Sequence, residues 1–459
     1  MPEIVIALVV LVATGWAIAR NYDAKVVLFT AGIILLYAAV LLGHPVLAAK
    51  ASTGLSWCDP FKVVKDLFVK QYSNAGLIIL TLFGFAAYMS NIGANQKVIE
   101  LLSKPLARIR SPYVLVPFVY WIGTLLSIII PSASSLAVIL MATLYPVLRA
   151  ARMSPLTAAG VIATTATIVP TPLGGDNVVA ARVLGFDNVV DYVFIHHAPI
   201  SIPALVVIGI AHYFWQKRMD LKAGAAAEFE IDRSKLSTQA LEAPLWYAVF
   251  PVLPLILTIF FWAAFEKAKV GLVEIAVFSF ALAFICEIAR KSRDPRTTAK
   301  KLMSEANLFF KGMGEGFSKV VILIVAASTM VAGLAALGII DRISSAISNV
   351  ENAESGLIFA FSGITALITF ISGSGNAVFY SFIELIPQIA ERAGIDPIMV
   401  ALPMQCTSHL FRAISPVAAV VIIVSAVIRE NPLNVVKRTA VPMIAGEIAV
   451  MVAAWIRYM

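Results

Sequence analysis

The chain has 459 residues, of which 60% are hydrophobic and only 14% are charged. Soluble domains are closer to half apolar and a quarter charged, so this composition excludes an ordinary soluble protein and indicates a polytopic membrane protein in a lipid bilayer. The formal net charge of +8 is expected from basic cytoplasmic loops, and nucleic-acid binding is not indicated. Three scattered cysteines form no pair that would indicate a disulfide framework or a zinc site.

Apolar runs predict an all-α chain. A spanning helix needs about 20 mostly apolar residues. Eight runs qualify: Pro2–Ala19, Val26–Ala48, Ala75–Asn95, Pro199–Trp215, Leu245–Phe265, Val270–Ile288, Val320–Ile340 and Ala440–Ile456. Four further stretches are apolar but too long for one straight span, and each is interrupted near its middle by Pro, Gly, Ser or Asn: Tyr113–Leu148, Leu156–Phe194, Leu357–Ile389 and Met399–Ile428.

The order of these pieces occurs twice. In each half a span is followed by a polar segment, a broken hairpin, a broken helix and a closing span. Ser132 and Ser374 stand 242 residues apart, as do Pro155 and Pro397, and the offset from Gly93 to Gly338 is 245. Landmarks in the same order predict an internal repeat. We therefore expect N-terminal scaffold helices (1–74), a first repeat (75–216), linking helices with basic loops (217–316) and a second repeat (317–459).

Charge predicts the orientation of the spans. Basic residues cluster in Gln96–Arg110, Lys217–Lys235, Arg290–Lys301 and Arg429–Arg438, which should face the cytoplasm, whereas the acidic segment Asn349–Ser355 should face outward. If each hairpin turns back and each broken helix crosses once, the chain makes ten crossings with both termini outside. The hairpins are then re-entrant from opposite faces, and the repeats have inverted topology.

A glycine-rich run at 312–316 has no preceding strand, which argues against a dinucleotide loop and predicts a flexible link.

The tips of the two broken hairpins are small and polar. Lipid cannot satisfy broken backbone, so such breaks survive only inside protein or beside a water-filled cavity. Half-helices beginning near Leu136 and Val378 would present positive dipole ends to an anion. No metal site is predicted apart from a sodium ion at the tips. A plain helix kink is the alternative. The candidate tip residues are Ser132, Ser134, Ser135, Ser372, Ser374, Gly375 and Asn376.

The second breaks, 170–177 and 409–416, combine Pro and Gly with ionisable residues. Asp176 and Arg412 are costly in a membrane and are functional candidates for that reason. Arg412 can bind a carboxylate bidentately, which lysine cannot. The alternative is a structural salt bridge between the two. His409 is a weaker candidate, because a lone histidine is more often a satisfied helix residue. The same two breaks also contain Thr171, Asn177 and Ser415.

Glu384 follows the second tip on an otherwise apolar helix. It is either a carrier of a proton or cation, like Asp176 and Asn177, or an outward-facing interfacial residue. No ATP-binding motif and no nucleophile–base pair are present, so neither an ATP-driven pump of that type nor an enzyme is indicated, and no cofactor is expected beyond a coupling sodium ion or proton.

Several motifs carry a resemblance that covers essentially the whole chain. They are Gly84-Phe85-Ala86-Ala87-Tyr88-Met89, Ile92-Gly93-Ala94-Asn95, Ser103-Lys104-Pro105-Leu106, Leu140-Met141-Ala142-Thr143-Leu144, Gly373-Ser374-Gly375-Asn376-Ala377, Ser415-Pro416-Val417 and Val435-Val436-Lys437-Arg438-Thr439. With them the sequence resembles the DcuC-type anaerobic four-carbon dicarboxylate carriers of the ion transporter superfamily. It departs from their pattern at 131–135, at 172–175 and at His409, where asparagine is expected.

The resemblance implies a homodimer in a bacterial inner membrane, with a scaffold domain and a transport domain that work by an elevator movement. It also implies succinate, fumarate, malate or aspartate as substrate. The residues that would bind substrate or coupling ion are the tips and Thr171, Asp176, Arg412 and Ser415. We expect dicarboxylate symport or antiport driven by an ion gradient or by exchange. A carrier of amino acids or monocarboxylates is the alternative; a channel or intramembrane enzyme would not explain an inverted repeat.

Overall fold

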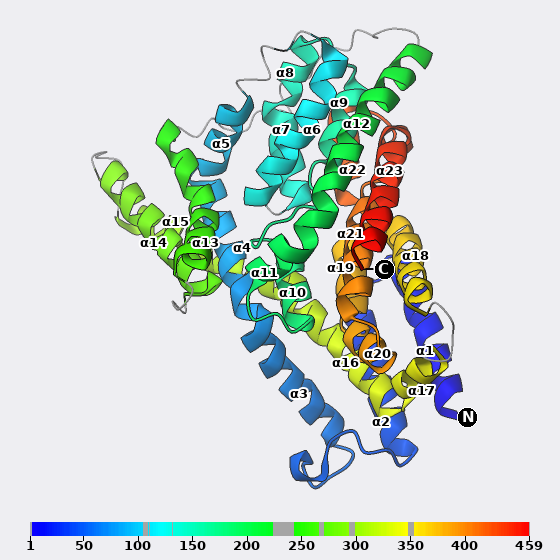
Figure 1. Ribbon diagram of the computed structural model, residues 1–459. Helices are drawn as coiled ribbons and strands as arrows, with labels where there is room; N and C mark the ends of the chain where they lie inside the picture. The colour runs from blue at the N-terminus through cyan, green and yellow to red at the C-terminus, as the bar shows by residue number, and fades with distance from the viewer. Residues whose placement is uncertain are drawn as a thin grey trace.

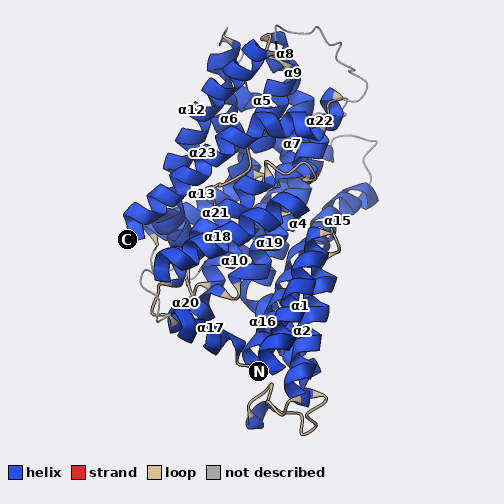
Figure 2. Ribbon diagram, turned by 90° about the vertical axis from the view of Figure 1, so that its right-hand side faces the viewer, coloured by secondary structure: helices blue, strands red, loops and turns tan. Residues whose placement is uncertain are grey.

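The computed structural model describes residues 2–103, 109, 111–130, 132–223, 243–265, 270–292, 299–347 and 353–458. Within these ranges it contains helices joined by turns and loops, and no strand (Figure 2). Parts of the basic segments (104–108, 110, 224–242 and 293–298) and most of the acidic segment (348–352) lie outside the described residues. The all-α prediction is confirmed for the described chain.

The first half contains two pairs of helices that are joined end to end by π-helical turns. η2 (Tyr72–Gly76) joins α3 to α4, and η4 (Tyr192–His197) joins α11 to α12. The α-helices are α1 (Pro2–Ala19), α2 (Ala24–Leu41), α3 (Asp59–Gln71), α4 (Leu77–Asn91), α5 (Ala94–Ser103), α6 (Pro112–Ile129), α7 (Ala133–Thr143), α8 (Tyr145–Ala150), α9 (Pro155–Thr164), α10 (Gly175–Val183), α11 (Val189–Asp191) and α12 (Ala198–Lys222). One 3-10 turn, η1, covers Ala49–Ala51.

The second half follows the same order. A 3-10 turn, η6 (Leu245–Ala248), precedes α13, and a π-helical turn, η7 (Phe317–Val321), joins α15 to α16. The α-helices are α13 (Val249–Ala264), α14 (Leu272–Lys291), α15 (Ala299–Gly316), α16 (Ile322–Ala336), α17 (Ile339–Ile347), α18 (Ala353–Ser372), α19 (Gly375–Ile383), α20 (Ile386–Arg392), α21 (Pro397–Arg412), α22 (Ala419–Ile428) and α23 (Pro432–Tyr458).

The internal repeat is visible in the elements themselves. η2 with α4 and η7 with α16 have equal lengths, and each pair ends at a glycine with positive φ, 77° at Gly93 and 67° at Gly338, where a side chain would be strained. The correspondence reaches back further than the sequence indicated: α2 packs along α16, and α14 packs against α4. Figure 1 shows α8 near one end of the molecule and α20 near the other. The boundaries at 74–75 and 316–317 fall within continuous helices.

Ten described helices are long and apolar enough to cross a membrane. Eight of them contain or overlap the eight predicted runs. The other two are α6 and α18, the first arms of the broken hairpins, whereas α9 and α22 of the broken helices are short. The predicted broken helix at 156–194 also ends early, because 189–194 continues into α12 as one helix.

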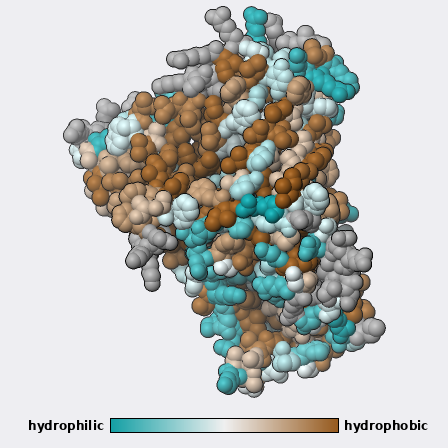
Figure 3. All heavy atoms as spheres, in the orientation of Figure 1, coloured by the Kyte–Doolittle hydropathy of each residue, from teal (hydrophilic) through white to brown (hydrophobic). Residues whose placement is uncertain are grey.

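Large hydrophobic side chains remain exposed along the spans, as expected for lipid-facing helices. Trp16 is 57%, Phe278 56% and Ile448 59% exposed. Figure 3 shows hydrophobic side chains gathered over the upper and central part of one face, with hydrophilic ones at its lower end. No soluble protein would leave this many apolar side chains in water. A bilayer is the surrounding that fits them.

Close contacts between helix backbones, which glycines allow, hold the spans together in lipid. The predicted flexible link at 312–316 is wrong, because this run is helical within α15. A Cβ added to Gly312 would lie 2.7 Å from the Phe83 carbonyl oxygen, and one added to Gly32 would lie 2.6 Å from the Met330 backbone nitrogen. Glycines at such crossings let helix backbones approach closely in lipid.

Candidate functional site

The two interruptions predicted as hairpin tips are short turns between helices. Ser132 begins α7 and accepts a hydrogen bond from Ser135 N at 3.4 Å, while its hydroxyl donates to the Ser135 hydroxyl at 3.0 Å. α19 begins at Gly375 without a side-chain cap, and Ser374 N donates to the Ser372 hydroxyl at 3.4 Å. The half-helices thus start three residues earlier than predicted. The uncapped start of α19 leaves N–H groups available to an anion.

Both tips and both second breaks surround one cavity of about 690 Å³. Its lining includes Asn21–Lys25 at the α1–α2 turn, several residues between Ala166 and Asp176 in and before the break at 170–177, and Lys319 in η7. The remaining polar lining comes from the tips, from α21 and from single residues of α6 and α19: Ser127, Ser132, Ser134, Ser135, Ser372, Ser374, Asn376, Tyr380, His409 and Arg412. A polar cavity enclosed by apolar spans is the place where broken backbone can be satisfied in a membrane.

Asp176 is paired with His409, and not with Arg412 as the sequence alternative supposed. Oδ2 of Asp176 lies 2.9 Å from Nε2 of His409 and accepts from Gln405 Nε2 at 3.0 Å. The same Gln405 nitrogen donates to Asn177 Oδ1 at 2.7 Å, and Tyr192 OH donates to Gln405 Oε1 at 2.5 Å. α21 therefore holds the start of α10 through an amide and an imidazole.

Arg412 reaches from the last turn of α21 to the loop at 165–174, which precedes α10. One Nη2 hydrogen bond goes to the Ala166 carbonyl oxygen, and the buried Nε has no partner among the described residues. No described acid lies within ion-pair distance of its guanidinium. A cation with an open donor on a cavity wall is suited to a carboxylate.

Two side chains hold the loop at 165–174: Thr171, which lies within it, and Asn177, which follows it. Asn177 Nδ2 donates to the carbonyl oxygens of Val169 (3.1 Å) and Thr171 (2.9 Å). Thr171 Oγ1 donates to Ile128 O at 3.1 Å, which ties the loop to the end of α6. In the second repeat, Gly373 has φ of 73°, and a Cβ there would lie 2.7 Å from the backbone nitrogen of Ala418, which follows the break at 409–416 and precedes α22. Each tip thus sits against unwound backbone.

Most predicted candidates meet at this cavity, but three do not line it. Asn177 acts behind it through Gln405; Ser415 is fully buried and its hydroxyl has no described partner. Glu384 lies elsewhere, at the contact of α19 with α3 and α16, where Gln71 Nε2 donates to it at 2.9 Å. Sequence reasoning gave His409 too little weight and missed Gln405 and Lys319. Only the position of His409 one turn before Arg412 could have raised its rank.

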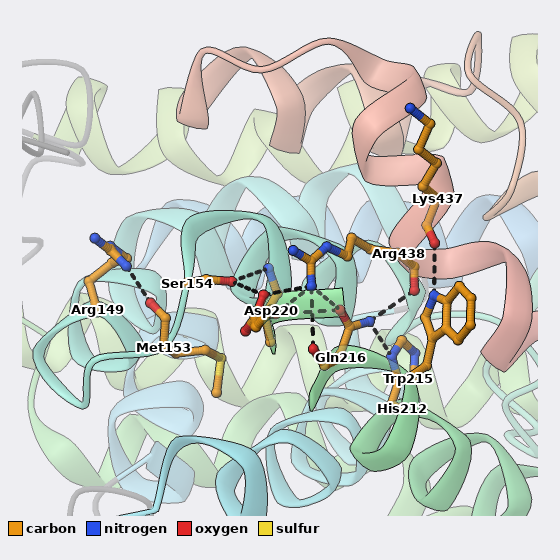
Figure 4. Close-up of polar contacts among 10 residues, drawn as sticks. Arg149, Met153, Ser154, His212, Trp215, Gln216, Asp220, Lys437 and Arg438 are labelled. Atoms are coloured by element: carbon orange, nitrogen blue, oxygen red, sulfur yellow. Dashed lines mark hydrogen bonds and ion pairs between the residues drawn. The ribbon is translucent and has the colours of Figure 1, made fainter. Parts of the chain in front are cut away.

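A second buried charge cluster lies away from the cavity and was not anticipated (Figure 4). Arg438 Nη1 is 2.6 Å from Asp220 Oδ1, and Asp220 accepts from Ser154 (2.8 Å) and Thr157 (2.9 Å) hydroxyls. Gln216 Nε2 donates to the Arg438 carbonyl oxygen at 2.9 Å and lies 3.1 Å from His212 Nδ1. We call Ser154, Thr157, His212, Gln216, Asp220 and Arg438 the Arg438 cluster; it joins α9, α12 and α23.

Comparisons with known proteins agree with this architecture. The sequence profile of the family described as "DcuC: C4-dicarboxylate anaerobic carrier" matches residues 1–459. The anaerobic C4-dicarboxylate transporter DcuC of Escherichia coli K12 is 37% identical over 452 residues, covering 98% of this chain and 96% of the relative. The probable anaerobic C4-dicarboxylate transporter DcuC of Vibrio cholerae is 35% identical over 460 residues, covering 99% and 98%.

Two solved structures share the fold at 16% sequence identity. MtrF of Neisseria gonorrhoeae, described as belonging to a class of antimetabolite efflux pumps, superposes with a TM-score of 0.59 over 96% of this chain and 97% of that one. The YdaH transporter of Alcanivorax borkumensis gives a TM-score of 0.63 over 95% and 99%. At this identity the likeness concerns the fold alone.

The apolar spans and the named bacterial relatives make this chain a multi-pass protein of the bacterial inner membrane, and a transporter rather than an enzyme. The family profile covers every residue, and relatives above 30% identity cover nearly all of the chain. The chain belongs to the C4-dicarboxylate anaerobic carrier family.

Proposed function

We propose that the protein is a secondary carrier of four-carbon dicarboxylates such as succinate, fumarate, malate and aspartate. The observation that carries this proposal is the single cavity at which both tips, Asp176 and Arg412 meet. The family membership and the names of the relatives support the same substrate class.

In this proposal Arg412 and the uncapped start of α19 hold carboxylate groups. The Arg412 Nε is an open donor, and the first N–H groups of α19 add a positive dipole end. Hydroxyls and amides of Ser132, Ser134, Ser135, Thr171, Ser374 and Asn376 would complete the shell around the four-carbon chain. Small residues at both tips let the backbone approach the ligand.

The transport cycle we propose is an elevator movement in a homodimer. The helices α6–α12 and α18–α23 pack on one another through α12 with α23 and through α9 with α22 and α23, and would form the transport domain. The helices α1–α4 and α13–α16 would form the scaffold. The turns at Ser132 and Ser374 would be re-entrant from opposite faces, which is supported by the placement of α8 and α20 at opposite ends (Figure 1).

Coupling would come from a proton or cation gradient, or from exchange of one dicarboxylate for another. Asp176 is the acid on the cavity wall and would carry the coupling charge, with Asn177 supporting it through Gln405. Glu384 does not line the cavity, so its role in coupling would have to be indirect. Sodium at the tips is an alternative coupling ion that imposed gradients would separate.

Uptake of labelled succinate into liposomes tests the proposal. Sodium and pH gradients are imposed separately, and exchange is measured with succinate or fumarate inside. We expect saturable uptake that malate and aspartate inhibit more strongly than amino acids without a second carboxylate or monocarboxylates. If neither exchange nor gradient-driven uptake appears, or if Arg412→Ala transports like the wild type, the assignment is wrong.

A further inference from the structure

One histidine stands apart from the other four in the chain. His409 is 4% exposed, lines the cavity, and its Nδ1 has no hydrogen-bond partner among the described residues. The other histidines do not line the cavity and have partners elsewhere: His44 with Glu3, His196 with Tyr458, His197 with Ser201, and His212 with Thr164 and Gln216. Nε2 lies against the Asp176 carboxylate, which leaves Nδ1 as the open nitrogen of the ring. A buried polar atom without a protein partner is completed by water or by a ligand, and the adjoining cavity can hold either.

The unused nitrogen is held in place from the opposite side of the ring. Asp176 Oδ2 lies 2.9 Å from Nε2, and Gln405 fixes that carboxylate at 3.0 Å. When an anion engages Nε2–H, the neutral imidazole keeps its lone pair on Nδ1. The ring is therefore held with Nδ1 as its free proton-accepting atom.

His409 and Arg412 are three residues apart in the last turn of α21, and both line the cavity. Side chains at this spacing are neighbours on a helix surface, with Cβ atoms roughly 5–6 Å apart. This separation suits the two ends of a short dicarboxylate. Of the cations that line the cavity, Lys25 and Lys319 are paired with Asp23 and Glu315, whereas Arg412 has no acidic partner among the described residues. A doubly charged substrate held by Arg412 therefore leaves one carboxylate to be matched.

We propose that His409 takes up one proton on Nδ1 as the substrate binds, and that the resulting imidazolium holds the second carboxylate of the substrate. This inference rests on the proposed dicarboxylate function. The proton comes from water in the cavity, and it leaves again when the substrate dissociates, so one proton accompanies each dianion. Where coupling is to a proton, His409 rather than Asp176 thus carries it, and Asp176 remains ionised throughout and acts as a positioning residue.

Other charged or titratable groups face the same region and must be separated from His409. They are Tyr22, Asp23 and Lys25 at the α1–α2 turn, Asp176 on α10, Tyr380 on α19, His197 in η4, Lys319 in η7 and Arg412 on α21 itself. Aspartate, tyrosine, lysine and arginine ordinarily keep one charge state around neutral pH, which leaves the histidines of this set as groups that change charge there. His197 is therefore the group that needs its own variant.

The test is equilibrium binding of labelled fumarate to the purified full-length protein between about pH 5.5 and 8.5, the range in which histidine titrates. Fumarate keeps both carboxylates ionised over this range. One linked proton weakens binding by up to about tenfold per pH unit above the histidine midpoint. We expect this slope in the wild type, in His44→Asn and in His197→Asn. It should vanish in His409→Asn and His409→Gln.

Two further measurements keep the result interpretable. Asp176→Asn should retain the slope, because the linked proton binds His409 and not Asp176. A pH-indicator dye should report proton uptake on fumarate addition to the wild type and none for His409→Gln. A wild-type slope in both His409 variants, or a slope lost only in His197→Asn, overturns the inference. Fumarate binding that is independent of pH would refute the inference alone, whereas no binding of any four-carbon dicarboxylate would refute the proposed function.

Discussion

Two buried clusters in this protein contain the same residue types and yet differ in how completely they are satisfied. The Arg438 cluster contains Asp220, Gln216, His212 and Arg438. The cavity cluster contains Asp176, Gln405, His409 and Arg412. In the first, the charged pair and its neighbours bond to one another, and no side-chain atom is left buried without a partner in the described chain. In the second, Arg412 Nε and His409 Nδ1 are open.

The difference separates a structural role from a binding role. A fully satisfied polar network in low dielectric rigidifies the helices that carry it. A network with open donors at a cavity costs stability until a ligand completes it. The Arg438 cluster does not line the cavity, whereas three of the four cavity-cluster residues do. We therefore expect substitutions in the first to change folding and substitutions in the second to change binding.

The largest expected effect is the loss of one partner in the Arg438 cluster. Asp220→Asn leaves the Arg438 charge buried and should lower the free energy of unfolding by about 3–5 kcal/mol. Replacing both residues, Asp220→Leu with Arg438→Met, should cost less than the single change, because no charge is left unpaired. Denaturation in detergent measures both. Equal cost for single and double variants would break the comparison.

The next effect concerns the fixed cation of the cavity. Arg412→Lys keeps the charge but loses the planar donor fork, and should weaken succinate binding by about 10–100-fold, as the loss of about 1.5–3 kcal/mol from a charge-assisted contact implies. Its free energy of unfolding should stay within about 1 kcal/mol of the wild type, because Arg412 has no acidic partner to strand. A destabilised Arg412→Lys with intact binding would reverse the assigned roles.

A smaller effect tests the contact between a tip and the second break. Gly373→Ala places a side chain at φ of 73° and 2.7 Å from Ala418 N, so it should cost about 1–3 kcal/mol and slow succinate exchange. Gly363→Ala is the control within α18, the helix that ends just before Gly373, since nothing lies within 4 Å of its added Cβ. Similar exchange rates for the two variants would show that the tip does not need this close approach.

The smallest effect is expected at Glu384. Glu384→Gln keeps the shape and the contact with Gln71, and Glu384 does not line the cavity. Its succinate affinity should stay within about threefold of the wild type, a change below 1 kcal/mol. A tenfold or larger loss would extend the functional region beyond the cavity cluster.

Much of the architecture follows from local sequence pattern. Apolar length predicted the spans, and Pro, Gly and Ser inside apolar runs predicted the breaks around Ser132 and Ser374. The repeat brought Asp176 and Arg412 into corresponding segments, and the structure places both at one cavity. That these residues bind substrate or ion stays a prediction.

What the sequence did not reveal are contacts between distant segments. His409 and Asp176 belong to different halves, so no spacing rule links them. Arg438 and Asp220 lie in segments whose charge indicated cytoplasmic loops, yet they form a buried pair. The run at 312–316 shows why glycine is ambiguous in a sequence, because it allows either a flexible link or a close helix contact. Gly312 packs closely against Phe83 of the first half, so its role here is packing.

The π-helical turns η2 and η7, one in each repeat, have a consequence for the rotational phase of the long helices. In η7 the Ile322 N–H bonds to the Phe317 carbonyl oxygen, so this turn holds one residue more than an α-helical turn. Deleting one residue there would restore a regular helix but rotate α15 relative to α16 by about 100°. Gly312 would then no longer face Phe83, and Lys319 would leave the cavity wall. One backbone residue in each repeat thus sets which helix face meets the substrate path, a property that no side-chain substitution can imitate.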